Sequence, residues 1–261
     1  MENSDFLKKS LFFVAISTKV VFLLCVYALF FVSLLHKSTI EAQIQPRIMK
    51  KKLSDIRKEY SLKTLDENDV LTDPYEQFNL WMGEAIKADV PEPTAMSLAT
   101  VDSNNMPSSR MVLLKELKVE GFVFYSNYHS RKGKHLEQNP YGSLLFFWPE
   151  LERQIRVQGR IDKASKEISD EYYLSRPGKS RIGAWASPQS EEIPDREWLE
   201  QKHAEYEMQF VGQIPKRPDH WGGYILTPYT FEFWQGRPQR LHDRIEYYLD
   251  DQEWRLRRLA P

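Results

Sequence analysis

Cysteine is almost absent from the 261-residue chain, and the only one, Cys25, lies in an apolar run near the N-terminus. The remainder of the chain therefore has no pair of thiols from which to form a disulfide. This usage is typical of proteins in a reducing compartment.

An excess of charge of one sign is also missing. The chain has 36 Lys and Arg residues against 37 Asp and Glu residues, which gives a formal net charge of −1. Because nucleic-acid proteins that bind through bulk charge are basic, this balance argues against that class, and any anion site must be local. The chain is 41% hydrophobic and 13% aromatic, so it can bury a sizeable core.

Two familiar kinds of ligand motif are missing as well. There is no glycine-rich phosphate loop, since the pair Gly222–Gly223 lies inside an expected strand. His203 and His220 have no carboxylate or histidine at metal-ligand spacing, so we expect no metal site. A cofactor would have to be held by side chains scattered along the chain.

Residues 11–35 form a long apolar stretch whose only charge is Lys19. The stretch meets the length of about 20 residues that a membrane helix needs, so we expect an anchor between a tail of residues 1–10 and a linker of residues 36–52. More basic residues follow the stretch than precede it, which places the C-terminal part in the cytoplasm. A cleaved signal or an organelle presequence is the alternative, and without an anchor we expect a cytoplasmic protein.

Residues 53–261 are expected to form one mainly β domain. Asp73, Pro74 and Glu76 mark the start of a helix that runs to about Lys87 and buries apolar residues, Ile86 among them. Runs rich in Val, Leu, Phe and Ile follow, separated by turn residues: 95–101, 109–115, 121–126, 143–148, 154–161, 221–234 and 245–249. Helices separate only some of these runs, which favours an antiparallel barrel over a doubly wound sheet.

The segment from Trp234 to Arg244 contains three arginines, a histidine and an aspartate between two expected strands. Binding residues are often placed on such loops, although a solvated loop is the alternative. Arg240 and His242 are two residues apart, so on an extended segment their side chains would share a face. We expect Asp243 to orient an arginine.

Two other stretches have the residue types that bind phosphate groups. Arg131 and Lys132 follow Ser130 at an expected helix start, where free backbone N–H groups favour an anion. Tyr172, Arg176 and Ser180 recur about one helical turn apart, and a guanidinium with two hydroxyl groups can hold a phosphate monoester. A solvated helix face and a helix C-terminus with a basic cap are the respective alternatives.

Together these stretches resemble the pyridoxine 5'-phosphate oxidase family over roughly residues 53–261. The motifs that carry the resemblance occur in the family's order: Arg110–Lys115, Ser130–Gly133, Ser175–Pro177, Gln189–Ser190, Glu232–Gly236, Arg240–Arg244 and Arg258–Pro261. The resemblance implies an FMN-binding split β-barrel with flanking helices that forms a homodimer. It further implies oxidation of pyridoxine or pyridoxamine 5'-phosphate to pyridoxal 5'-phosphate, with oxygen as acceptor and hydrogen peroxide as product.

The resemblance also implies a role for each matched position. The expected FMN contacts are Arg110, Met111, Val112, Leu113, Tyr125, Ser126, Arg131, Lys132, Gln154, Gln189, Ser190, Trp234 and Arg244. The expected substrate contacts are Arg57 and Tyr60 on a flexible cover, with Lys115, Tyr172, Arg176, Ser180, Arg240 and His242. Arg240 and His242 are the expected catalytic residues.

Two other functions stay open. One is a membrane-tethered, non-catalytic binding protein for FMN or pyridoxal phosphate, which would need FMN contacts or phosphate contacts but not both. The other is an FMN-dependent reductase of the same barrel class, which the sequence Arg240-Leu241-His242 disfavours.

Overall fold

The computed structural model describes residues 52–261, and the chain divides into two units, residues 1–58 and 59–261. The described part of the first unit contains a short 3-10 helix, η1 (Leu53–Asp55). The predicted anchor of residues 11–35 lies outside the described residues and stays a prediction. Within residues 52–261, no helix is long and apolar enough to cross a membrane.

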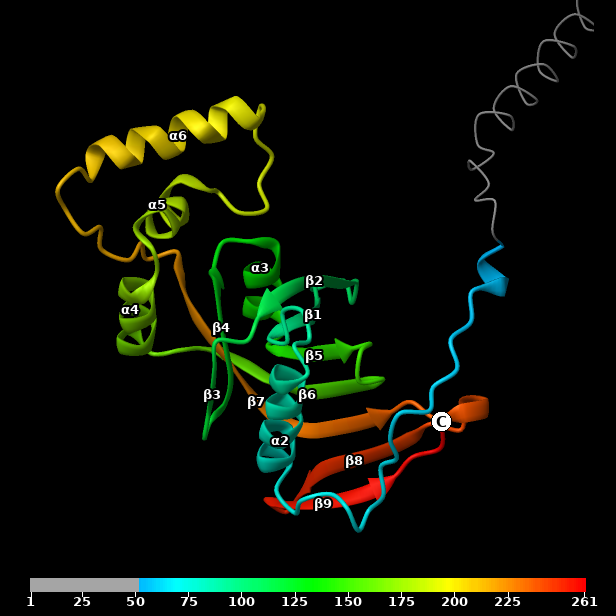
Figure 1. Ribbon diagram of the computed structural model, residues 1–261. Helices are drawn as coiled ribbons and strands as arrows, with labels where there is room; N and C mark the ends of the chain where they lie inside the picture. Colours follow the sequence, from blue (N-terminus) through cyan, green and yellow to red (C-terminus); the bar gives the residue numbers. More distant parts are fainter. Residues whose placement is uncertain (1–51) are drawn as a thin grey trace, which may run out of the picture. The chain divides into compact units, whose positions relative to one another are not determined.

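The second unit is built on one antiparallel sheet that curls into a half-barrel (Figure 1). Its strands are β1 (Ala95–Val101), β2 (Pro107–Leu113), β3 (Glu116–Lys118), β4 (Gly121–Asn127), β5 (Tyr141–Trp148), β6 (Arg153–Lys163), β7 (Trp221–Gln235), β8 (Asp243–Asp250) and β9 (Glu253–Arg258). The order is β2-β1-β5-β6-β7-β4-β3, and β8 joins β7 and β9. The prediction of a mainly β, antiparallel fold with flanking helices is confirmed.

Strand β7 joins the β8–β9 pair to the rest of the sheet. Its first half pairs with β4 from Trp221 to Leu226, and its last six residues, 230–235, pair with β8, while β6 runs along its other edge. The register of β6 against β7 shifts between Gln158 and Gly159. A Cβ atom at Gly159 would lie 2.2 Å from the Thr227 carbonyl oxygen, so the bulge depends on glycine at this position.

Helix α2 (Pro74–Lys87) covers the core and begins as predicted. The Asp73 carboxylate accepts hydrogen bonds from the backbone N–H groups of Tyr75 and Glu76, which satisfies two donors of the first turn. Its apolar face packs on aromatic residues of the sheet: the ring of Phe78 is 4.9 Å from that of Phe122. One prediction was wrong, because Ile86 is 57% exposed and faces away from that core.

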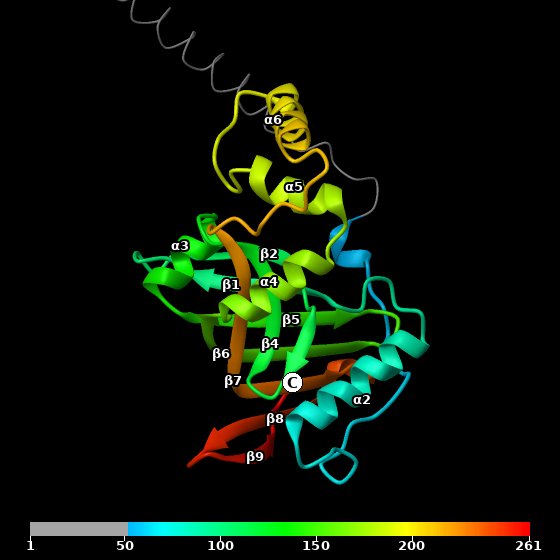
Figure 2. The same ribbon diagram turned by 90° about the vertical axis from the view of Figure 1, so that its left-hand side faces the viewer.

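The remaining helices are α3 (Arg131–Gln138), α4 (Lys166–Ser175), α5 (Gly178–Ala186) and α6 (Arg196–Gln209). α5 and α6 lie side by side at the end of the unit away from β8 and β9 (Figure 2). Trp185 of α5 packs against the rings of Tyr206 and Phe210, which are 5.9 and 5.4 Å away. These contacts pack the aromatic side of α6 against α5.

Candidate active site

The first group of candidate residues gathers where β4 ends and α3 begins. Ser130 caps α3, and its side chain accepts from the Gly133 N–H group, as the predicted helix start requires. The Lys132 ammonium is buried and donates to the Ser126 hydroxyl at 3.0 Å and to the Gln189 amide oxygen at 2.8 Å. Three predicted cofactor contacts therefore meet in space, although Gln189 lies 57 positions from Lys132 in the sequence.

Arg110 on the neighbouring edge strand β2 completes this group. Its guanidinium donates to the Leu98 carbonyl at 3.1 Å, to Thr100 Oγ1 at 2.8 Å and to Ser108 Oγ at 2.8 Å. With Arg131 and Ser190 it lines an open hollow in the surface. Ser190 lies there in the left-handed region, with φ of 73°.

Within residues 52–261, every hydrogen-bond partner of Arg110 and Lys132 is a neutral oxygen. Burial, together with the nearby charge of Arg110, lowers the pKa of Lys132 to about 8. Burial, with the charge of Arg131, also lowers the pKa of Arg110. A buried cation, Lys132, and a partly buried one, Arg110, neither with a counter-charge among the described residues, fit an anionic group of a ligand, such as a phosphate.

A second group surrounds Trp221 at the start of β7. The rings of Tyr125 and Tyr172 stack with centroids 3.8 Å apart, and Trp221 lies nearly parallel to both. The Arg176 guanidinium carbon lies 4.5 Å from the centroid of the Trp221 ring, a cation–π contact. Burial raises the pKa of Tyr125 to about 12 and lowers the pKa of Arg176.

One nitrogen of Arg176 lacks a partner. Its Nη1 atom is buried and makes no hydrogen bond within residues 52–261. A buried donor of a charged group without an acceptor is costly, and an anion at this position would satisfy it.

Two other residues predicted for this group are not held in it. α4 ends at Ser175 and α5 begins at Gly178, so Ser180 does not continue the helix of Tyr172. The three residues are therefore divided between two helices, because the backbone turns at Arg176 and Pro177. Ser180 and Lys115 are both exposed, and their roles stay predictions.

A third group lies at the C-terminal end of β7. The rings of Trp234 and His242 are 4.6 Å apart, and the ring of Tyr60 meets both edge-on at 5.7 and 5.8 Å. Trp234 also lies opposite Gln154 of β6 and Arg244 of β8. The pairing places three predicted cofactor contacts in one row across the sheet.

The segment between Trp234 and Arg244 is not extended, which corrects the geometry predicted for Arg240 and His242. It contains the 3-10 helix η2 (Pro238–Arg240), in which Gln239 and Arg240 have φ of 56° and 62°. Arg240 is exposed, whereas His242 is partly buried and its Nδ1 atom accepts from the Arg237 N–H group at 3.1 Å. The two side chains therefore do not share a face through strand alternation.

The other predicted residues lie outside these three groups or are held by partners of their own. Arg244 is held by both oxygens of the buried Glu232 carboxylate, at 2.9 and 3.0 Å. Met111 and Leu113 are exposed on the edge strand, 63% and 39%, whereas Val112 packs on the core. Arg57 belongs to the first unit, where its side chain donates to the Ser54 carbonyl.

The comparisons with known proteins give the same family for both parts of the second unit. Residues 82–210 match the family described as pyridoxamine 5'-phosphate oxidase, and residues 221–261 match the pyridoxine 5'-phosphate oxidase C-terminal dimerisation region. The pyridoxine/pyridoxamine 5'-phosphate oxidase of Neisseria gonorrhoeae is 54% identical over 209 residues, which are 80% of this chain and 99% of that protein. The enzyme of the same name from Cytophaga hutchinsonii is 54% identical over 82% of this chain and all of its own length.

This chain belongs to the pyridoxamine 5'-phosphate oxidase family. It is a flavin-dependent oxidoreductase, and its cofactor is FMN. The solved structure of PhzG from Burkholderia lata, in complex with tetrahydrophenazine-1-carboxylic acid, superposes with a TM-score of 0.73 at 32% identity, over 77% of this chain and all of that chain. The predicted family and cofactor are thereby confirmed.

The residues around the Arg110–Lys132 hollow suit the FMN of this family. A flavin mononucleotide ends in a phosphate, and the hollow has the buried Lys132, the partly buried Arg110, the exposed Arg131 and the N-terminus of α3. The chemistry of the donors therefore fits the cofactor that the family requires.

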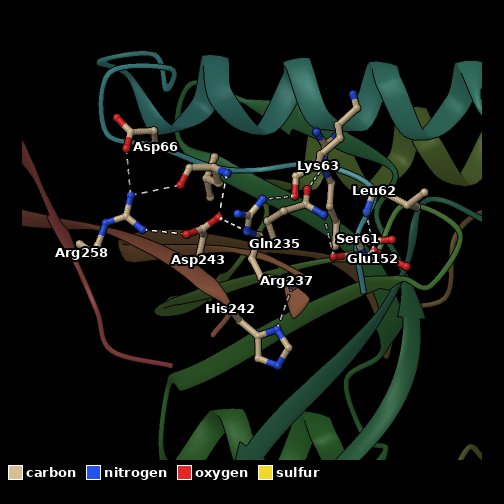
Figure 3. A network of polar contacts seen from close by, with 12 residues as sticks. Ser61, Leu62, Lys63, Asp66, Glu152, Gln235, Arg237, His242, Asp243 and Arg258 are labelled. Carbon is tan, nitrogen blue, oxygen red and sulfur yellow. Dashed lines mark hydrogen bonds and ion pairs between the residues drawn. The ribbon is translucent and has the colours of Figure 1, made fainter. Parts of the chain in front are cut away.

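Two carboxylates, Glu152 and Asp243, hold the segment after Tyr60 beside the third group, and sequence analysis did not point to Glu152 (Figure 3). The Glu152 carboxylate accepts from the backbone N–H groups of Ser61 and Leu62, and Asp243 accepts from that of Leu65. Asp243 also pairs with Arg237 and Arg258, which confirms that it orients an arginine. Glu152 lies in a polar turn that reads as solvated, so no spacing or motif marks its buried contacts.

Proposed function

We propose that this chain oxidises pyridoxine 5'-phosphate or pyridoxamine 5'-phosphate to pyridoxal 5'-phosphate, with oxygen as acceptor and hydrogen peroxide as product. The observation that carries the proposal is the buried, unpartnered Nη1 atom of Arg176, which is separate from the cation group at Arg110 and Lys132. An enzyme of this type needs two phosphate sites, one for the cofactor and one for the substrate.

We assign the substrate phosphate to Arg176 and Tyr172. Arg176 is held by Trp221, so one edge of its guanidinium is fixed before a ligand arrives. Tyr172 adds a neutral phenol donor, because burial raises its pKa and keeps the hydroxyl protonated. Lys115 and Ser180 are exposed, and we assign them supporting contacts that form only when the phosphate is bound.

We assign the FMN phosphate to Arg110, Arg131 and Lys132, with Ser126, Gln189 and Ser190 around it. Gln154, Trp234 and Arg244 lie in one row on the sheet and would contact the rest of the cofactor. The FMN contacts of residues 111–113 would be made by the exposed edge of β2. When bound, FMN supplies the redox chemistry by accepting two electrons from the substrate and passing them to oxygen.

The substrate ring would be held by His242 and Arg240. Because His242 Nδ1 accepts from a backbone N–H group, the proton of the neutral imidazole is on Nε2, which can donate to a ring substituent. Arg240 lies exposed on η2 and would close over the ring. Arg57 and Tyr60 would complete the cover and exclude water.

The assembly would be a homodimer with FMN at the subunit interface. The match of residues 221–261 to the family's dimerisation region supports the dimer. The exposed apolar side chains of Met111 and Leu113 on β2 are suited to burial against a second copy.

The test uses the purified full-length chain loaded with FMN. Pyridoxine 5'-phosphate is added under air, and pyridoxal 5'-phosphate and hydrogen peroxide are measured together. We expect equal amounts of both products, and a much lower kcat/KM for pyridoxine without its phosphate. A yellow protein that binds the phosphorylated ligand without turnover would favour the carrier. Equal kcat/KM for both forms would contradict the assignment of Arg176.

A further inference from the structure

The segment that carries Tyr60 is fastened to the sheet by a buried carboxylate. Glu152 is 3% exposed, and one of its oxygens, Oε2, accepts from the Ser61 N–H group at 2.8 Å and from the Leu62 N–H group at 3.0 Å (Figure 3). Hydrogen bonds to an ionised acceptor are about twice as strong as neutral ones. Two such bonds to adjacent residues fix the direction of the backbone directly after Tyr60.

Glu152 is itself held by the sheet. It lies in the turn between β5 and β6 with φ of 54°, in the left-handed region. Its carbonyl oxygen accepts from the Gly236 N–H group at 2.7 Å and from the Gln235 side chain at 3.2 Å. The Gln235 amide oxygen in turn accepts from Arg153 at 2.9 Å. The carboxylate is therefore presented by a rigid part of the fold.

The contacts of Tyr60 depend on this placement. A Cβ atom at Gly236 would lie 2.7 Å from Tyr60 Cγ and 3.0 Å from Glu152 Cβ, so the three residues pack closely. From there the Tyr60 ring reaches Trp234 and His242, edge-on to both. Only a residue without a side chain at position 236 leaves room for this approach.

We propose that Glu152 is a positioning residue that holds Tyr60 over the Trp234–His242 pair, and that affinity for the substrate ring depends on it. This inference rests on the proposed function for its effect on substrate. The placement of Tyr60 by Glu152 does not depend on the proposed function, because residues of this chain alone make the contacts.

The effect of losing Glu152 should be local, because the segment has a second attachment. Asp243 Oδ2 accepts from the Leu65 N–H group at 3.1 Å, and the Leu65 side chain is buried. Arg258 also donates to the Leu65 carbonyl and pairs with Glu67. Removing the Glu152 carboxylate therefore takes the acceptor away from the Ser61 and Leu62 N–H groups and leaves residues 65–67 attached.

The first measurement is hydrogen exchange of the full-length holoenzyme, followed by mass spectrometry on peptides that span residues 59–65. In Glu152→Ala, the amides of Ser61 and Leu62 should exchange roughly ten- to a hundredfold faster, as expected for loss of bonds to a charged acceptor. Glu152→Gln retains an acceptor oxygen and should restore most of the protection. Glu150→Ala is the matched control, because Glu150 is exposed in the same turn and carries the same charge.

The second measurement is a double-mutant cycle with Tyr60. We expect Glu152→Ala to raise KM for pyridoxine 5'-phosphate about fivefold with kcat changed less than about twofold, and to have almost no effect in a Tyr60→Ala background. Glu152→Gln should return KM close to that of the unaltered chain. Retention of FMN in every variant shows that the fold and the cofactor site are intact.

Unchanged exchange at Ser61 and Leu62 in Glu152→Ala would overturn the inference, and so would additive effects of Glu152→Ala and Tyr60→Ala on KM. If the unaltered chain binds FMN but oxidises neither phosphorylated substrate, the proposed function fails. The exchange measurement then decides the positioning of Tyr60 without reference to turnover.

Discussion

The FMN-phosphate region and the substrate-ring region are built in different ways. Around Lys132, buried or partly buried side chains from β2, β4 and α3 are held by hydrogen bonds before any ligand is bound. Around Arg240, the backbone lies in a short 3-10 helix with two residues at positive φ, and the arginine is exposed. In the function proposed above, the first region serves affinity for FMN and the second serves turnover.

Arg240→Ala should show the largest effect, confined to the ring region. We expect kcat/KM for pyridoxine 5'-phosphate to fall about 10²- to 10³-fold, because the ring loses its exposed cationic cover and its near-attack position. FMN content, measured from the flavin absorbance, should not change. Arg237→Ala is a comparison on the same loop, and loss of FMN from Arg240→Ala would place that residue on the cofactor side.

Lys132→Met tests the FMN-phosphate region. We expect the Kd for FMN to rise roughly ten- to a hundredfold, because a charge-assisted contact to the phosphate is lost while the apolar stem of the side chain remains. At saturating FMN, kcat should be close to that of the unaltered chain. Lys134→Met is the matched control, since Lys134 is exposed on the same helix. Equal weakening by both variants would mean that α3 attracts FMN only through general charge.

The pH dependence of FMN binding sharpens the same contrast. Burial lowers the pKa of Lys132 to about 8 in the free protein, so the ammonium loses its proton as pH rises through that value. Phosphate binding favours the charged form, and the Kd for FMN should therefore rise by about tenfold between pH 7 and pH 9. Fluorescence titration of the apoprotein measures this change, and Lys132→Met should remove most of it.

The stability of the apoprotein should increase with pH, whereas its affinity for FMN decreases. An unfolded lysine keeps its proton up to a pKa of about 10.4, so the unfolded chain binds more protons than the folded chain between pH 8 and that value. Lys132 therefore makes the folded apoprotein more stable as pH rises through this interval. A denaturant titration at pH 8 and at pH 10, with Lys132→Met as reference, isolates this contribution.

Elements that bury apolar residues could be predicted from the sequence. Helix α2 has both a capping aspartate and apolar residues at helical spacing, and the long strands alternate or run apolar. β9 was missed because four of the six residues of Glu253–Arg258 are charged, and it forms a strand through its ladder with β8. The short strand β3 has three residues, too few for a period to appear.

In the site, too, some features could be predicted from the sequence and others depend on tertiary contacts. The resemblance to the family predicts which residues bind the ligands, but not how their side chains are held. Lys132 reads as a solvated helix residue, and its burial depends on Gln189, which is 57 positions away. Gln239 and Arg240 adopt positive φ although neither is glycine, so the sequence does not indicate this backbone conformation. Tertiary contacts determine both features, and local sequence does not encode them.

Ser180→Ala should have the smallest effect, and it tests whether exposure separates the two kinds of site. Ser180 is assigned to the substrate phosphate, yet it is as exposed as the ring loop and lies beyond the break between α4 and α5. We expect KM for pyridoxine 5'-phosphate to rise less than about threefold, because the hydroxyl has to be ordered when the ligand binds and gains little net free energy. Arg176→Ala should raise the same KM much more. If Ser180→Ala raised KM as much as Arg176→Ala, the hydroxyl would have to be fixed in the bound state. Exposure in the free protein would then no longer distinguish supporting contacts from the residues that anchor the phosphate.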